Sequence, residues 1–181
     1  MTYYGGKDLA AAFRTVRNNT IKIANDIPED KYDFKASPDT RSVRETLVHL
    51  ALATTWADHV HRNKISDMAT VNFQELMGTM NAEQAKPRTK SEIIALLQTA
   101  GDGFASYMEG LTDAFLGESV KMMPGAQPTK SRFELLLGAK EHEMHHRGQL
   151  MLIERIIGIV PHLTRDFQER MSRMQTAQPQ R

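Results

Sequence analysis

Apolar residues recur at three- and four-residue steps along most of this chain, which is the spacing of an amphipathic helix. The first run ends at Pro28 and predicts a helix over residues 7–27, whose apolar face comprises Leu9, Phe13, Val16, Thr20, Ile23 and Ile27. Arg14, Arg17 and Lys22 are expected on the opposite side of this helix, where they would face solvent.

Helical spacing continues and predicts three further helices, over residues 43–64, 90–116 and 131–158. Ser42 followed by Glu45 has the pattern of a capping box, in which each side chain satisfies a backbone N–H of the other residue, so the second helix should begin directly after Ser42. Thr89 or Ser91 is expected to cap the third helix. Gly158 is the expected stop signal of the fourth.

No segment alternates apolar and polar residues at the two-residue period of a strand, so the chain is predicted to be all-α, a four-helix bundle with short extra helical segments and no sheet. Its 181 residues are enough for one hydrophobic core, and a single domain is expected, with the bundle over about residues 7–160. A short helix is expected over residues 72–84. One or two more helical turns should follow residue 164, before a disordered tail at 175–181.

Composition excludes several classes of protein. The formal net charge is +1 and charged residues make up 25% of the chain, so no overall field attracts nucleic acid or an anionic membrane. No apolar run approaches the ~20 residues that a membrane-spanning helix needs, and the first residues lack the features of a secretory signal, so a cytoplasmic protein is expected. The absence of cysteine excludes a disulfide framework and a thiolate metal site. Any thiol in the chemistry must therefore arrive with a substrate.

Three of the seven histidines occupy positions that should face the core. On the fourth predicted helix, one inward stripe comprises Leu135, Ala139, His142, His146, Gln149, Ile153 and Ile157. On the second, His49 shares a face with Thr46, Ala53, Trp56 and Val60. Burying three imidazoles without a common partner is costly, so we expect His49, His142 and His146 to bind one divalent metal ion, with positions left open for water. The other histidines are expected to be solvated, namely His59, His61, His145 and His162.

The segment His142–His146 also matches H-E-x-x-H, the pattern of a zinc metalloprotease. The metzincin form of that pattern needs a glycine at position 149 and a histidine at position 152, where this chain has Gln149 and Leu152. A di-iron bundle needs two E-x-x-H segments, and the chain has one, Glu143–His146. Both of these metal sites therefore rank below the three-histidine site.

Three segments carry a resemblance to a known family: SVRETLVHLA at residues 42–51, EHEMHHRGQL at 141–150, and LIERIIGIVPHL directly after it. Together they resemble the DinB-like, or YfiT-like, family of metal-binding four-helix bundles, over most of the chain to about Pro161. The resemblance implies that His49, His142 and His146 are the ligands of a zinc, nickel or iron ion. It also implies frequent homodimers, and transfer or isomerisation reactions that use a small thiol such as bacillithiol, mycothiol or glutathione.

Three functions follow as hypotheses, and whether the protein is an enzyme stays open. The leading one is a metal-dependent transferase or isomerase that uses a low-molecular-weight thiol and an electrophilic small molecule. The alternative is a non-catalytic metal-binding stress or interaction module, and a minor alternative is a metallohydrolase that uses the H-E-x-x-H segment. No catalytic residue is assigned. Glu45 and Glu143 are candidate partners for ligand N–H groups, Gln149 is a candidate to orient a metal-bound water, and Arg147 is as well explained by a structural contact.

Methionines are frequent in the connections between the predicted helices, with two phenylalanines nearby: Met68, Met77, Met80, Met122, Met123, Phe73 and Phe115. A monomer would usually leave less apolar surface in its loops, so a homodimer is expected. The alternative is that these residues fold back over the end of the bundle as a small additional core.

Overall fold

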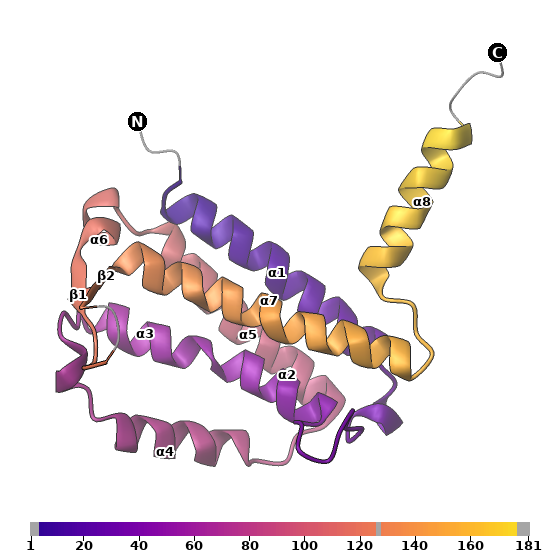
Figure 1. The fold of residues 1–181 in the computed structure, drawn as a ribbon, viewed down its shortest axis with the longest axis horizontal. Helices are drawn as coiled ribbons and strands as arrows, with labels where there is room; N and C mark the ends of the chain where they lie inside the picture. The colour runs from indigo at the N-terminus through magenta and orange to yellow at the C-terminus, as the bar shows by residue number, and fades with distance from the viewer. Residues whose placement is uncertain (1–3, 126–127, 177–181) are drawn as a thin grey trace.

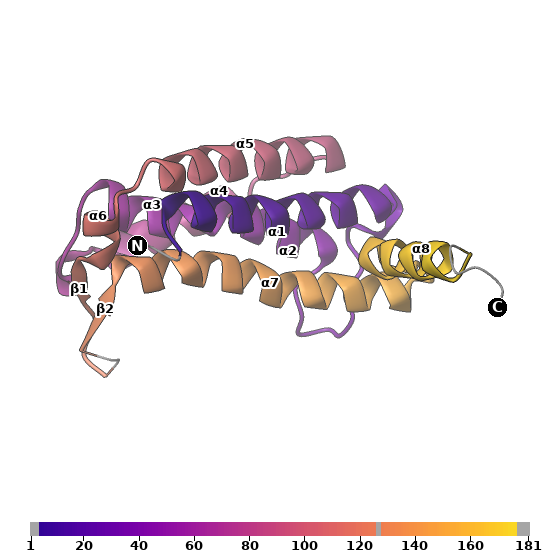
Figure 2. The ribbon, with the colours of Figure 1, turned by 90° about the horizontal axis from the view of Figure 1, so that it is seen from above.

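Four long helical segments form the core of the protein, in a computed structural model that describes residues 4–125 and 128–176. The segments are α1 (Gly6–Asp26), α2 (Val43–Leu52) followed by α3 (Thr54–Arg62), α5 (Lys90–Glu109) and α7 (Arg132–Ile156) (Figure 1). Helices α1 and α2 each pack against both α5 and α7, and Figure 2 shows α5 and α7 on opposite sides of α1. The predicted all-α four-helix bundle is confirmed.

The apolar face predicted for the first helix is buried along its whole length. Its six residues are each at most 6% exposed, so the face supplies one wall of the core. At the start of α1, a side chain at Gly6 would come within 2.4 Å of the Met108 carbonyl oxygen and 2.7 Å of that of Leu111. Glycine at this position therefore allows α1 to pack directly on the backbone at the end of α5.

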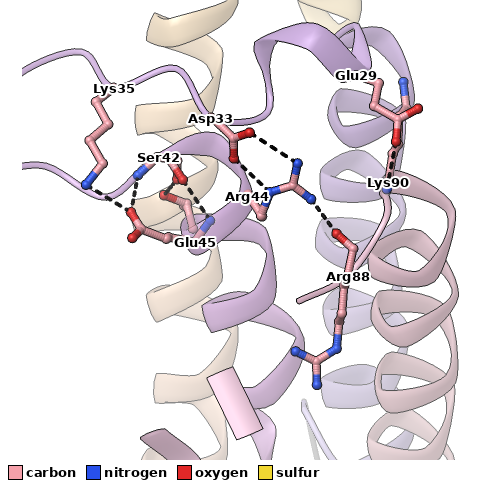
Figure 3. Close-up of polar contacts among 9 residues, drawn as sticks. Glu29, Asp33, Lys35, Ser42, Arg44, Glu45, Arg88 and Lys90 are labelled. Carbon is pink, nitrogen blue, oxygen red and sulfur yellow. Dashed lines mark hydrogen bonds and ion pairs between the residues drawn. The ribbon is translucent and has the colours of Figure 1, made fainter. Parts of the chain in front are cut away.

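The predicted capping and stop residues are also confirmed. Ser42 N–H donates to the Glu45 carboxylate at 2.6 Å, and Glu45 N–H donates to Ser42 Oγ at 3.2 Å, which completes the capping box (Figure 3). Of the two candidate caps of α5, Thr89 is the N-cap. Gly158 has φ +88°, a conformation that favours glycine, and it stands directly after the C-cap of α7.

Two predicted helices are interrupted. The helix expected over residues 43–64 breaks at Ala53, although Ala53 N–H still donates to the His49 carbonyl at 2.9 Å, and α3 continues along the same side of the bundle (Figure 1). The helix expected over residues 90–116 ends at Glu109, and α6 (Asp113–Gly117) follows it. Thr112 is the reason for the restart, because its side chain accepts a hydrogen bond from Phe115 N–H and caps a new helix.

The expectation of no sheet is wrong in one place. Strands β1 (Ser119–Lys121) and β2 (Thr129–Ser131) pair antiparallel, with Val120 opposite Lys130. Three residues are too few to show a two-residue alternation in the sequence, and for this reason the pattern did not reveal them. Val120 is fully buried, and the short strands thereby close the end of the bundle next to α7.

Two helices lie outside the bundle. Helix α4 (Phe73–Gln84), predicted within one residue, runs along the outside of α2 and α3 and has no buried residue (Figure 1). Helix α8 (His162–Thr176) projects from the bundle beyond the end of α7 and contacts α1. It is longer than the one or two turns expected, and it includes part of the stretch expected to be disordered. The rest of that stretch, 177–181, lies outside the described residues.

The methionine-rich connections are partly covered within one chain. Met68 is buried with Val60 and Val120, and partly buried Phe73 and Met122 pack against them. Much of the apolar surface that suggested a homodimer therefore belongs to this small additional core, while Met77 and Met123 are exposed. The homodimer stays a prediction.

Among the described helices, none combines the length and the apolar character required to cross a membrane.

Candidate metal centre

Three histidines from two helices meet in the interior of the bundle. His49 lies on α2, and His142 and His146 lie one turn apart on α7, which packs against α2. The ring centroids are 5.0 Å apart for His49 and His142, 5.0 Å for His49 and His146, and 4.7 Å for the α7 pair. One ring nitrogen from each lies within 4.8 Å of the others. We call His49, His142 and His146 the histidine triad.

The spacing of the triad nitrogens suits a single ion. His49 Nε2 and His142 Nε2 are 3.1 Å apart. Two nitrogens bound at ~2.1 Å to one tetrahedral ion lie about 3.4 Å apart, so a shift of a few tenths of an ångström would bring this pair to that spacing. Nitrogen donors of this kind suit zinc, nickel or ferrous iron. The residues present therefore fit the metal ion that the sequence led us to expect.

Two glutamines hold the outer nitrogens of the triad. Gln84, at the end of α4, lies with its Oε1 3.3 Å from His49 Nδ1, and Gln149 Oε1 lies 2.7 Å from His146 Nδ1. In the tautomer with the proton on Nδ1, each histidine donates to its glutamine and presents the Nε2 lone pair toward the other rings. Gln149 was expected to orient a metal-bound water, and it instead contacts an imidazole of the triad. Sequence reasoning missed Gln84, because no spacing connects it with a histidine 35 residues earlier.

Burial makes the triad favour its neutral form. It is the main cause that lowers the pKa of each of the three imidazoles, and it lowers that of His142 to about 4, with the neighbouring His146 and His49 adding to the effect. For His49 the positive charge of Arg41 is the second cause. Neutral imidazole is the form that binds metal, because its lone pair is free. The triad is therefore ready to coordinate an ion at neutral pH.

A cavity of about 380 Å³ adjoins the triad, with His49 and His142 in its wall. Its surface is mainly apolar, from α2, α3, α4 and α7: Leu50, Ala53, Trp56, Ala57, Met80, Leu135, Gly138 and Ala139. Lys130 and Glu134 are among its polar residues. A volume of this size is within the range of small-molecule sites. An ion held by the triad would be next to space for an apolar substrate.

A buried ion pair lies beside the triad, and it corrects two expectations. Arg17 Nε is 2.8 Å and 3.0 Å from the two carboxylate oxygens of Glu143, and its other nitrogens donate to the carbonyls of Leu97 and Leu50. Both side chains are at most 4% exposed. Arg17 therefore does not face solvent, since Gly101 leaves the room that its side chain fills. Glu143 pairs with Arg17 and not with an N–H group of the triad.

Two other histidines expected to be solvated are buried. His61 is 1% exposed, because it lies on the inward face of α3 near Phe115 and Arg132, and burial lowers its pKa to about 4 with the charge of Arg132 adding. His162 is 4% exposed, because α8 begins against α1 and places His162 Nε2 3.1 Å from Asn19 Oδ1. Neither belongs to the triad. The spacing of residues along the sequence could not predict their burial, because the residues that cover them come from other parts of the chain.

The remaining candidates lie at the edge of the site or away from it. His145 is exposed, as expected, yet its Nε2 lies 3.2 Å from Gln149 Nε2, so it connects to the triad through that side chain. Glu45 is engaged by the capping box and by Lys35, and so is not a partner of His49. Arg147 is partly buried, and its Nε has no hydrogen-bond partner among the described residues.

Comparisons with known proteins agree with this architecture. The family model of the DinB superfamily matches residues 12–150. The chain is 24% identical over 150 residues to the uncharacterized protein YjoA of Bacillus subtilis, a match that covers 83% of this chain and 89% of YjoA.

Solved structures show the same fold. The crystal structure of YjoA matches with a TM-score of 0.61 at 23% identity, over 83% of this chain and 92% of that one. YfiT of Bacillus subtilis, described as a probable metal-dependent hydrolase with an unusual four-helix bundle topology, matches with a TM-score of 0.67 at 14% identity, over 88% and 91%. An uncharacterized protein of Clostridium difficile matches with a TM-score of 0.66 at 13% identity, over 87% and 99%.

Proposed function

The chain belongs to the DinB superfamily, and from this premise we propose that it is a metal-dependent transferase in which the histidine triad holds one divalent ion and a small thiol is the nucleophile. One observation carries the proposal: three imidazoles that favour the neutral form converge, and two of them, His49 and His142, line an apolar cavity of about 380 Å³. A structural metal site is usually closed by a fourth protein ligand. No fourth histidine, cysteine or carboxylate joins the triad among the described residues.

The charge of the site favours an anionic nucleophile. The ligands are neutral, and the groups behind them, Gln84 and Gln149, are neutral amides, so the chain supplies no negative charge through the triad or its two glutamines. A divalent ion held there would supply Lewis acidity, which lowers the pKa of a thiol bound beside the histidines. The chain has no cysteine of its own. The thiol would therefore come from a second substrate.

The side chains around the triad have roles in binding. The apolar wall, with Trp56 and Leu135, would hold the electrophilic substrate and exclude water, and Lys130 offers a positive charge to a leaving group that departs as an anion. The thiol sulfur forms a bond to the electrophilic carbon, the leaving group takes the bonding electrons, and the thiol proton passes to solvent. Glu143 serves as no base here, because its carboxylate is held by Arg17.

Hydrolysis is the second candidate. The open side of a three-histidine site also accepts water, and YfiT, which shares the fold, is described as a probable metal-dependent hydrolase. Against it stands the position of Glu143: the H-E-x-x-H pattern needs this glutamate as a free base, and it is buried in an ion pair.

The test begins with the purified protein, its metal content and its reaction with 1-chloro-2,4-dinitrobenzene, with and without glutathione or cysteine. We expect about one metal ion per chain and turnover that requires both metal and thiol. His146→Ala should lose both, whereas His145→Ala should keep most of the metal. Bound metal without any thiol-dependent turnover would instead indicate a binding module. Metal-dependent cleavage of an ester such as 4-nitrophenyl acetate without thiol would indicate a hydrolase.

A further inference from the structure

A second hollow lies behind His49, separate from the apolar cavity. It is a groove of about 420 Å³ whose wall includes Lys35, Asp39, Arg41, Glu45 and Gln84. Gln84 belongs to its wall and also contacts His49 Nδ1 at 3.3 Å. His49 itself belongs to the wall of the apolar cavity. His49 therefore lines the apolar cavity directly, and it is connected to the polar groove through Gln84.

The charged groups of the groove differ in whether they already have a partner within the protein. Lys35 Nζ is 3.3 Å from the Glu45 carboxylate, which also accepts from Ser42 N–H (Figure 3). Asp39 accepts from Ser37 Oγ at 2.5 Å. Arg41 is exposed, and across the described residues it has neither a hydrogen bond nor an ion pair. The guanidinium of Arg41 is thus the cation of this groove that is free to take a ligand.

The position of Arg41 is fixed although its side chain is free. Arg41 directly precedes Ser42, whose backbone and side chain are both held in the capping box of α2. On the other side, the contact of Lys35 with Glu45 ties the incoming loop to the same helix end (Figure 3). Burial is the main cause that lowers the pKa of the three triad imidazoles, and the charge of Arg41 is a smaller cause, second for His49 and last for His142 and His146.

We propose that Arg41 binds a carboxylate of the thiol substrate, which occupies the polar groove, while the electrophile occupies the apolar cavity. This inference rests on the proposed function. A guanidinium can bind a carboxylate through two parallel hydrogen bonds, which fixes its orientation as well as its position. The two substrates would then reach the triad from different sides, one recognised by charge and the other by apolar contact. Arg41 is a specificity residue in this arrangement.

The experiment measures thiol binding without turnover. The protein is loaded with cobalt(II), and 3-mercaptopropionate and its methyl ester are titrated while the thiolate-to-cobalt absorption band is followed. Wild type should bind the acid about three- to tenfold more tightly than Arg41→Gln does, as expected for one charge-assisted contact at an exposed site. Binding of the ester should be nearly the same in both proteins. Arg41→Lys should restore part of the difference.

Two controls separate the possible causes. Lys35→Gln removes a charge from the same groove that is already paired with Glu45, so it should change the acid's affinity less than Arg41→Gln. Cobalt content should not fall in Arg41→Gln, because removal of a positive charge near the triad cannot weaken its binding of a cation. Unchanged preference for the acid in Arg41→Gln overturns the role of Arg41 while thiol binding at the metal stands. Absence of the band with both thiols overturns the proposed function as well.

Discussion

Helix α7 buries two glutamates three turns apart, and they differ in every other respect. Glu143, beside the histidine triad, is 2% exposed and forms an ion pair with Arg17. Glu154, near the end of the helix, is 0% exposed, and neither of its carboxyl oxygens has a hydrogen-bond partner within the described part of the chain. Burial raises the pKa of Glu154 to about 7, with the charge of Asp26 adding to the effect.

Both carboxyl groups are buried, so burial does not explain the difference between them. The difference is that Glu143 has a charged partner and Glu154 has none among the described residues. Arg17 satisfies Glu143 and two backbone carbonyls at once, so the region around the triad is held by a closed polar network. Around Glu154 no such partner exists among the described residues, and this carboxyl is neutral over much of the range below pH 7. One end of α7 therefore holds its carboxyl group in an ion pair, whereas the carboxyl group at the other end has no such partner and a pKa near neutral.

The largest effect is expected from breaking the closed network. Arg17→Leu leaves Glu143 buried without its cation, and loss of one member of a buried pair costs about 3–5 kcal/mol of unfolding free energy. Urea unfolding at pH 7 measures it. Arg14→Leu is the matched control on the same helix, because its pair with Glu109 is exposed and contributes ~1 kcal/mol at most. Equal losses in the two variants would contradict the importance of the buried pair.

The gain in unfolding free energy that metal provides should depend on the triad at one end of α7 and not on Glu154 at the other end. Zinc or nickel at 100 to 1,000 times its Kd should raise the unfolding free energy of wild type by about 2.7–4.1 kcal/mol, since the folded state alone has the assembled triad. His146→Ala should lose this gain and Glu154→Gln should retain it. Thermal unfolding with and without metal is the measurement, and a gain that survives in His146→Ala would show that the ion binds elsewhere.

The fold was predictable because its signals are local. The spacing of apolar residues and the capping residues Ser42 and Thr89 lie within a few positions of the elements they define, and the structure agrees with them. The meeting of His49 with His142 and His146 was also predictable, because helical periodicity states which residues face inward and a bundle has one interior. Whether these residues bind metal stays a prediction.

The errors concern partners that come from distant parts of the chain. Arg17 carries a charge that helical patterns assign to solvent, and its burial depends on Glu143, 126 residues later, and on the space left by Gly101. Gln84 lies on a helix without a buried residue, so no pattern marked it as a neighbour of His49. These contacts depend on how the helices pack against one another. Residues that meet in this way are far apart in the sequence, so no short spacing reveals them.

Glu154→Gln should remove a dependence of stability on pH. In the unfolded chain a glutamate has a pKa near 4.5, and in the folded protein that of Glu154 is about 7, so the folded state binds more protons between these values. Stability from this group is fully present below pH 4.5 and is lost as the pH rises to about 7, by roughly 2–3 kcal/mol. Relative to wild type, Glu154→Gln should gain that amount between pH 5 and pH 8 in urea unfolding. Parallel pH profiles would contradict it.

The smallest effect distinguishes two changes that break the same ion pair. Asp26 and Arg165 are 2.6 Å apart and partly exposed, and the pair contributes at most ~1 kcal/mol. The charge of Asp26 raises the pKa of Glu154, whereas the charge of Arg165 lowers it. Asp26→Asn should therefore move the loss of stability to lower pH, and Arg165→Gln should move it to higher pH. Both shifts should disappear when Glu154→Gln is added, because the titrating group is then absent. If the two variants shift the profile in the same direction, the ion pair itself controls the pH dependence and Glu154 does not.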